Sequence, residues 1–300
     1  MVWRMKDGLA RLFSALELRR LGGLHLHARF PVEGTMLGAH RSTQRGVSLE
    51  FSDYRAYVPG DDLRHLDWRI MARNERLFIR QYEQECNLRV HLLVDVSGSM
   101  AYAGAGRESK FRTAARLAAA LAYVTVRQQD LVALTLFSDR IRGQFPLGGG
   151  GEHLRQLANR LATEEPGAAT DIAGSLHQLA DSIRRRALVV IISDLYDDLE
   201  KLRQALAHFR RRRHDVIVYH LLDPAEREFA FGEDTAFTDL ETGEELAVDP
   251  RELRGAYCAR FEQFLQETRT LCAGFDVDYV PAVGIDDLPL FLQRHLVRRG

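Results

Sequence analysis

The sequence is poor in cysteine and proline. Its 300 residues contain only three cysteines and eight prolines. The cysteines (Cys86, Cys258 and Cys272) are odd in number, widely spaced and form no CxxC pair. This excludes a disulfide framework and is typical of a reducing compartment. The scarcity of proline excludes a collagen-like or proline-rich chain.

The sequence also lacks any apolar segment of membrane-spanning length. Its apolar runs, such as residues 187–192, are far shorter than the roughly 20 residues that a transmembrane helix needs. The N-terminus leads into a charged amphipathic segment and has no apolar core of a signal peptide. We therefore expect a cytoplasmic protein with no membrane insertion.

Charge of one sign is concentrated in only one part of the chain. The formal net charge is −1, yet residues 224–300 carry 8 basic and 16 acidic residues. No segment is basic enough for a dedicated nucleic-acid binder. The arginine clusters at 184–186 and 210–213 end predicted helices, where positive charge complements the helix dipole. Together the two clusters could form one basic face, so nucleic-acid binding remains a minor alternative. Retention on DNA or RNA that weakens as salt is added would test it.

The pattern of apolar residues changes near residue 88. Before it, a helix is predicted over 7–20 and strands near 24–30, 46–51 and 76–82, which together indicate a smaller mixed α+β domain at residues 1–87. After it, apolar strands alternate with amphipathic helices, with strands predicted at 88–94, 131–137, 141–145, 187–192, 216–222 and 275–280. This alternation predicts an α/β fold with a doubly wound, mostly parallel sheet over residues 88–300. The acidic segment at about 224–249 is interpreted as a hairpin insertion.

Polar side chains follow two of the predicted strands and precede one predicted helix. Asp95, Ser97 and Ser99 follow the first strand, Asp194 follows the strand at 187–192, and Thr170 stands before the helix that starts at 172. Ligands of such folds bind at the carboxyl ends of the strands. Oxygen-only ligands suit a hard divalent cation, Mg²⁺ first, with Mn²⁺ and Ca²⁺ as alternatives. Each loop alone also fits a plain turn or, for Thr170, a helix cap.

These residues resemble the metal-ion-dependent adhesion site of von Willebrand factor type A domains. The surrounding sequence is similar to one family of bacteria and archaea, domain of unknown function 58. The similarity covers nearly the whole chain and rests on Gly38–Ser42, Gly46–Phe51, Tyr57–Arg64, Asp67-Trp68 and Ala72-Arg73.

The resemblance implies a function in binding. It implies that Ser97 and Ser99 hold the metal through hydroxyls, Thr170 directly or through water, and Asp95 and Asp194 often through water. It also implies that a protein partner offers a Glu or Asp to the metal. The family further implies that the chain works beside a MoxR-type AAA+ ATPase, as its adaptor in assembling or maturing another complex.

A metal-dependent hydrolase that uses the same cation as a Lewis acid is the alternative function. An activated nucleophile needs a base within hydrogen-bond reach, and no base is evident beside the Asp95 loop. His91 lies inside the predicted strand and is expected to be packed. We therefore predict no catalytic residues and expect a protein that is not an enzyme.

A dense charged block precedes the predicted α/β domain. It contains three carboxylates, a tryptophan and an arginine: Asp61, Asp62, Asp67, Trp68 and Arg69. We interpret it as a staple between the two domains through Arg–Asp pairs, with Trp68 packed on the sheet domain. The alternative interpretation is a second partner surface.

Overall fold

The computed structural model describes most of the predicted α/β domain and parts of the segment before it. The described residues are 8–29, 40–41, 50–57, 77–83, 85–167, 172–229, 237–238, 245–246 and 250–299. The chain divides into two compact units. Residues 30–88 form the smaller unit, and residues 1–29 together with 89–300 form the larger.

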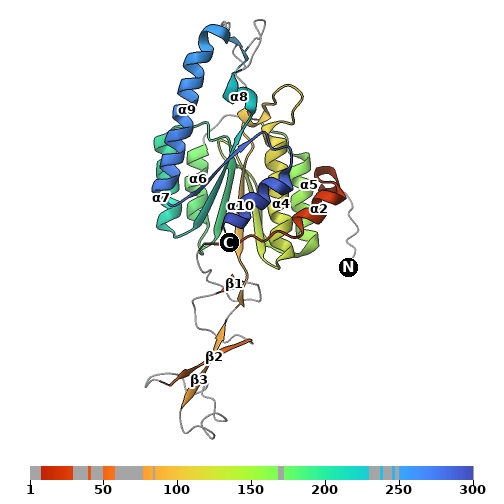
Figure 1. Cartoon of the computed structure of the whole chain (residues 1–300), viewed down its shortest axis with the longest axis vertical. Helices are drawn as coiled ribbons and strands as arrows, with labels where there is room; N and C mark the ends of the chain where they lie inside the picture. The colour runs from red at the N-terminus through yellow and green to blue at the C-terminus, as the bar shows by residue number, and fades with distance from the viewer. Residues whose placement is uncertain are drawn as a thin grey trace. The chain divides into compact units, whose positions relative to one another are not determined.

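The larger unit is built on one six-stranded sheet (Figure 1). Its strand order is β12-β9-β8-β5-β6-β7, and every neighbouring pair is parallel except β6 and β7. The strands are β5 (Arg89–Asp95), β6 (Leu131–Phe137), β7 (Ile141–Gly148), β8 (Leu188–Ser193), β9 (Asp215–Leu222) and β12 (Asp278–Val283). The predicted α/β class with a doubly wound, mostly parallel sheet is confirmed.

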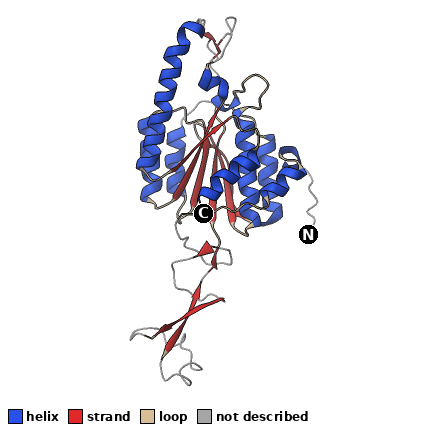
Figure 2. Cartoon of the chain, in the orientation of Figure 1, coloured by secondary structure: helices blue, strands red, loops and turns tan. Residues whose placement is uncertain are grey.

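Helices cover both faces of this sheet (Figure 2). The helices of the α/β domain are α4 (Lys110–Arg127), α5 (Gly150–Thr163), α6 (Ile172–Ser182), α7 (Leu199–Arg211), α8 (Pro224–Glu228), α9 (Pro250–Gly274) and α10 (Leu288–Arg299). Alternate strand residues such as Leu93, Ile191 and Val218 belong to the core under α6 and α7. Strands β8 and β9 are buried along their whole length because helices shield both faces.

The N-terminal residues pack on the larger unit, which corrects their predicted place in a domain of residues 1–87. The predicted helix over 7–20 is two helices, α1 (Gly8–Leu12) and α2 (Ala15–Leu21), because Ser14 forms a capping box with Glu17 and starts the second. Arg116 of α4 donates to the Leu12 carbonyl and pairs with Glu17. The described residues 24–29 form no strand; instead Leu26 exchanges two hydrogen bonds with the side chain of Gln128.

The smaller unit contains two short antiparallel pairs. Strand β2 (Glu50–Ala56) pairs with β3 (Phe78–Glu83), and β1 (His40–Arg41) pairs with β4 (Glu85–Cys86). In the acidic segment of the larger unit, β10 (Phe237–Thr238) pairs with β11 (Glu245–Leu246). Phe229, in the same segment, is the C-cap residue of α8. Within the described part of the chain, every helix is too short or too polar to cross a bilayer.

Candidate functional site

The carboxyl ends of β5 and β8 lie at the point where the strand order reverses. Strand β5 has β6 on one side and β8 on the other, so the chain leaves β5 in one direction and later returns beside it. Asp95 is the last residue of β5, and Asp194 directly follows β8. Both side chains are fully buried. The fold therefore brings these two predicted site residues to the usual ligand-binding position of an α/β sheet.

Asp95 organises the loop that carries the two predicted hydroxyls. Its Oδ1 accepts a hydrogen bond from the Ser97 backbone N–H at 2.8 Å, and its Oδ2 accepts one from the Ser193 hydroxyl at 2.6 Å. Ser97 stands before the short 3₁₀ helix η2 (Gly98–Ala101), and its Oγ lies 3.2 Å from the Oγ of Ser99. Asp95, Ser97 and Ser99 thus lie together at the end of β5.

Asp194 is paired with a cation from the chain itself. The Lys110 ammonium donates to Asp194 Oδ2 at 2.8 Å and to Glu226 Oε1 at 2.6 Å. Only 4% of the Lys110 side chain is exposed. Its Nζ also lies 4.7 Å from the centre of the Tyr196 ring, within the range of a cation–π contact. The result is a buried triad of one ammonium and two carboxylates.

Sequence reasoning missed the other two members of this triad, Lys110 and Glu226. Lys110 is the first residue of α4, after the N-cap Ser109. A positive charge is unfavourable at a helix N-terminus, so this placement was a signal that the lysine has an acidic partner elsewhere. Glu226 closes a capping box with Asp223 at the start of α8, and that local pattern hides its second contact, with Lys110.

The described cluster carries more negative than positive charge. The cluster holds three buried carboxylates, Asp95, Asp194 and Glu226, whereas its one ammonium, that of Lys110, contacts Asp194 and Glu226. Burial, together with repulsion from Asp194, raises the pKa of Asp95 to about 7. Burial also raises the pKa of Glu226, although Lys110 opposes the shift. A bound cation would relieve this repulsion.

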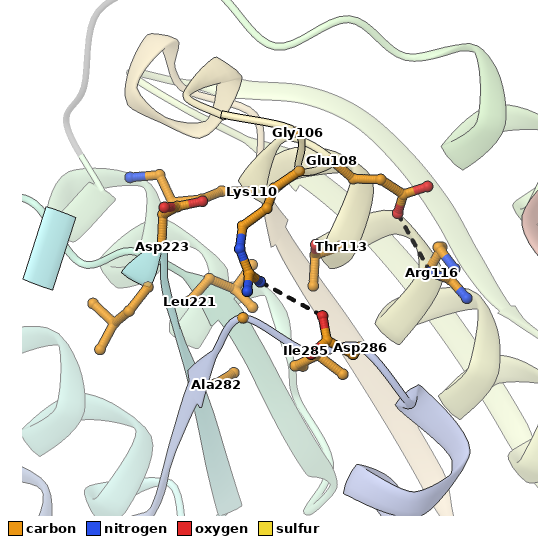
Figure 3. Close-up of a pocket in the computed structure, with 13 residues that line it drawn as sticks. Gly106, Glu108, Lys110, Thr113, Arg116, Leu221, Asp223, Ala282, Ile285 and Asp286 are labelled. Carbon is orange, nitrogen blue, oxygen red and sulfur yellow. Dashed lines mark hydrogen bonds and ion pairs between the residues drawn. The ribbon is translucent and has the colours of Figure 1, made fainter. Parts of the chain in front are cut away.

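A cavity lies beside the triad, between the start of α4 and the ends of β9 and β12 (Figure 3). Its volume is about 270 Å³, and Lys110, Asp223, Leu221 and Ala282 are among the residues that line it. The ion pair between Arg107 and Asp286, at 3.6 Å, also borders it. The cavity is large enough for several water molecules beside Lys110.

The remaining predicted site residues lie outside the described part of the chain. These are Thr170 at the candidate metal site, and Asp61, Asp62, Asp67, Trp68 and Arg69 in the charged block. The described part of the loop before Thr170 ends at Gly167, whose N–H donates to the Val96 carbonyl at 2.9 Å. The start of this loop is therefore tied to the residue that follows Asp95. The roles of Thr170 and of the charged block stay predictions.

Several proteins are similar to this chain. An uncharacterized protein of Mycobacterium tuberculosis and one of Mycobacterium bovis are each 28% identical over 235 residues, which cover 76% of this chain and 72% of each relative. The solved structure of the conserved hypothetical protein BatB from Bacteroides thetaiotaomicron matches with a TM-score of 0.49 and 16% identity, over 71% of this chain and 98% of that one. The SpRpn10 VWA domain matches with a TM-score of 0.38 and 10% identity, over 70% and 95%.

The family match covers well over half of the chain. The model of the family described as "Protein of unknown function DUF58" matches residues 53–267. This span runs from strand β2 into helix α9 and includes Asp95, Lys110, Asp194 and Glu226. The chain therefore belongs to the DUF58 family.

Proposed function

We propose that this protein is a non-enzymatic module that binds a partner protein through a divalent cation held at the carboxyl edge of the sheet. The observation that carries the proposal is a pair of hydroxyls 3.2 Å apart, the buried Ser97 and the half-buried Ser99, beside a buried cluster with surplus negative charge. Neighbouring ligands of an octahedral Mg²⁺ ion lie about 3 Å apart, given metal–oxygen distances of about 2.1 Å. The donor set therefore fits Mg²⁺, with Mn²⁺ and Ca²⁺ as alternatives.

The residues that would hold the cation are Ser97 and Ser99 through their hydroxyls and Asp95 and Asp194 through carboxylates or water. Thr170 joins them in the proposal on sequence grounds. Both oxygens of Asp95 already accept hydrogen bonds from Ser97 and Ser193. Because the hydroxyl ligands are neutral, the cation keeps much of its charge and attracts a Glu or Asp side chain of the partner.

The alternative function, hydrolysis with the same cation as a Lewis acid, needs a base near the metal. Among the described residues, His220 is the imidazole that hydrogen-bonds to this site. Its Nε2 lies 2.8 Å from the Asp194 carbonyl oxygen and its Nδ1 lies 2.8 Å from the Tyr279 hydroxyl. Burial lowers the pKa of His220 to about 4. Since both ring nitrogens are engaged and the ring is fully buried, His220 does not fit the role of a base toward substrate.

The proposed partner is a MoxR-type AAA+ ATPase, with this chain as its adaptor in the assembly or maturation of another complex. Membership of the DUF58 family supports this choice, together with the resemblance stated for the sequence. The proposal places the complex in the cytoplasm, where the ATPase finds its nucleotide.

The test is a comparison of the wild-type chain with Ser97→Ala/Ser99→Ala. This double variant removes two hydroxyl ligands without changing charge. Calorimetry should show one-to-one Mg²⁺ or Mn²⁺ binding by the wild type and none by the variant. The matched control, Ser182→Ala, removes a hydroxyl that bonds only within the end of α6 and should bind the metal normally.

Partner binding is then measured with a purified MoxR-type ATPase. A chelator cannot be used to remove the metal, because the ATPase itself needs Mg²⁺ for its nucleotide. The Ser97→Ala/Ser99→Ala variant is used instead, since it lacks the proposed metal ligands. The wild type and Ser182→Ala should bind the ATPase, whereas the double variant should not. Metal binding that survives in the double variant would remove the metal assignment; loss of metal binding without loss of ATPase binding would remove the role of the metal in docking.

A further inference from the structure

A second cluster of potential metal ligands lies on the surface where α6 and α7 pack. His177 and Asp181 are one helical turn apart on α6, and His208 lies on α7. One nitrogen of His208, Nδ1, lies 3.4 Å from His177 Nδ1, and the other, Nε2, lies 3.2 Å from Asp181 Oδ1. One ligand atom from each of the three residues can be chosen so that all lie within 4.8 Å of one another.

We propose that these three residues bind a Zn²⁺ ion, at a site independent of the oxygen cluster at the sheet edge. Two imidazole nitrogens and one carboxylate oxygen are ligands that Zn²⁺ accepts. With bonds of about 2.0–2.1 Å, two ligands of a tetrahedral Zn²⁺ lie about 3.3 Å apart. The separation of 3.4 Å between the His177 and His208 nitrogens matches this spacing.

The two helices bring one atom of each ligand within 4.8 Å of the others, and because Asp181 contacts the opposite nitrogen of His208 from His177, its carboxylate must move to join the ion. Residues four apart on a helix lie on the same face, so His177 and Asp181 project together toward α7. Only 12% of the His208 side chain is exposed, whereas 57% of that of Asp181 is. The carboxylate therefore has the freedom to close on an ion beside a fixed imidazole. Three protein ligands leave the fourth position for water, and the ion would tie α6 to α7.

The same cluster contains a competitor for the carboxylate. Arg212 donates to Asp181 Oδ1 at 2.9 Å. If the cluster only joins the two helices by hydrogen bonds, Arg212 and His208 share Asp181 and no ion is needed. If it binds Zn²⁺, the guanidinium opposes the metal by charge repulsion and by occupying a ligand. Removal of Arg212 should then strengthen Zn²⁺ binding, a result that a purely structural role does not produce.

The experiment measures Zn²⁺ binding by calorimetry on the full chain, freed of metal and kept in excess Mg²⁺, which imidazole ligands do not retain. The exposed-surface variants are His177→Gln, Asp181→Asn and Arg212→Gln. The control His25→Gln removes another exposed imidazole, which lies near His27. Co²⁺ is used in parallel, because its absorption spectrum separates imidazole and carboxylate ligands from a thiolate such as Cys258.

We expect one Zn²⁺ per chain in the wild type and in His25→Gln. Binding should weaken at least about tenfold in His177→Gln and Asp181→Asn, and it should become tighter in Arg212→Gln. The Ser97→Ala/Ser99→Ala variant should bind Zn²⁺ like the wild type, which keeps this test independent of the proposed function. The proposal is overturned if the wild type binds no Zn²⁺, if His177→Gln binds as tightly as His25→Gln, or if Co²⁺ gives a thiolate spectrum.

Discussion

Charged side chains cluster at both ends of the sheet, and the two clusters differ in their balance of positive and negative charge. At the carboxyl end, Lys110 pairs with Asp194 and Glu226, and the buried Asp95 adds a third carboxylate. At the amino ends of β9 and β12, Asp215 and Asp278 are matched by Arg29 and Arg299. Arg299 bonds to both carboxylates, Arg29 Nη2 lies 2.9 Å from Asp278 Oδ1, and the Arg29 backbone N–H donates to Asp215.

The comparison separates a structural cluster from one suited to a ligand. In the amino-end cluster each carboxylate pairs with a guanidinium, so the charges are balanced. Because Arg29 and Arg299 come from distant parts of the chain, these ion pairs also hold both segments to the sheet. The carboxyl-end cluster has excess negative charge and hydroxyls beside it. Burying unpaired charge is costly, so such an excess is expected where a cation binds.

The largest effect is expected from Lys110→Met. This change removes the cation that pairs with the buried Asp194 and Glu226, and breaking a buried ion pair from one side costs about 3–5 kcal/mol. For a chain of this size the thermal midpoint should fall by about 10 °C. Mg²⁺ should restore more stability to this variant than it adds to the wild type, because Lys110 no longer competes for Asp194. Thermal unfolding with and without Mg²⁺ measures both effects.

The matched control is Lys201→Met, which removes an exposed lysine of α7 and should leave the midpoint unchanged. If Mg²⁺ does not raise the thermal midpoint of Lys110→Met, the carboxyl-end cluster does not bind this cation. The two clusters would then not differ in their ability to accept a ligand.

A somewhat smaller loss is expected from Arg299→Met. Its side chain is 1% exposed and contacts Asp215 and Asp278, but Arg29 remains to neutralise part of their charge. We expect the free energy of unfolding to fall by about 3 kcal/mol. Urea denaturation measures this loss. In contrast to Lys110→Met, added Mg²⁺ should return none of it. Recovery with Mg²⁺ would show that the amino-end cluster also accepts a cation.

The amino-end cluster should also make the stability of the protein depend on pH in the acid range. Burial alone would raise the pKa of Asp278, but a hydrogen bond with His295 and the charges of Arg299 and Arg29 lower it to about 2. A carboxylate whose pKa is lowered in the folded state stabilises the protein at pH values above its ordinary pKa of 3.8. That stability is lost as the pH falls toward 2. The contribution is on the order of 2 kcal/mol at neutral pH.

Urea denaturation between pH 5 and pH 2 tests this sign. Asp278→Asn should start less stable than the wild type at pH 5 and should lose less stability on acidification. Parallel pH profiles for the two proteins would assign the acid sensitivity to other carboxyl groups.

The two clusters also show how far a sequence of this kind predicts its structure. Asp95, Ser97, Ser99 and Asp194 could be placed because each follows an apolar strand, and parallel strands deliver their carboxyl ends to one edge. Lys110 and Glu226 could not, because a helix start and a capping box explain them locally, while their contact spans 116 positions in sequence. The amino-end cluster was missed for the same reason. Its contacts bring together Arg29 and Arg299, which lie far apart in the sequence, around Asp215 and Asp278.

The N-terminal residues illustrate a related limit. Their apolar spacing predicted a helix over 7–20 and its approximate extent, but the break at Ser14 depends on a cap that competes with continuous helix. The packing of these helices on α4 depends on contacts such as Arg116 with Glu17. Local periodicity carries no information about such long-range partners.

The smallest effect is expected from Arg20→Gln. This change removes an exposed ion pair that has the same separation as the buried Lys110–Asp194 pair. Arg20 Nη1 lies 2.8 Å from Asp287 Oδ2, the same separation as Lys110 Nζ from Asp194 Oδ2. Both partners of the Arg20 pair are 41% exposed, so water already solvates each charge and salt screens their attraction. Thermal unfolding should show no measurable change in midpoint relative to the wild type, at low or at high ionic strength. A loss comparable to that of Lys110→Met would mean that contact geometry, and not burial, sets the strength of ion pairs in this protein. The distinction between the two ends of the sheet would then have no energetic basis.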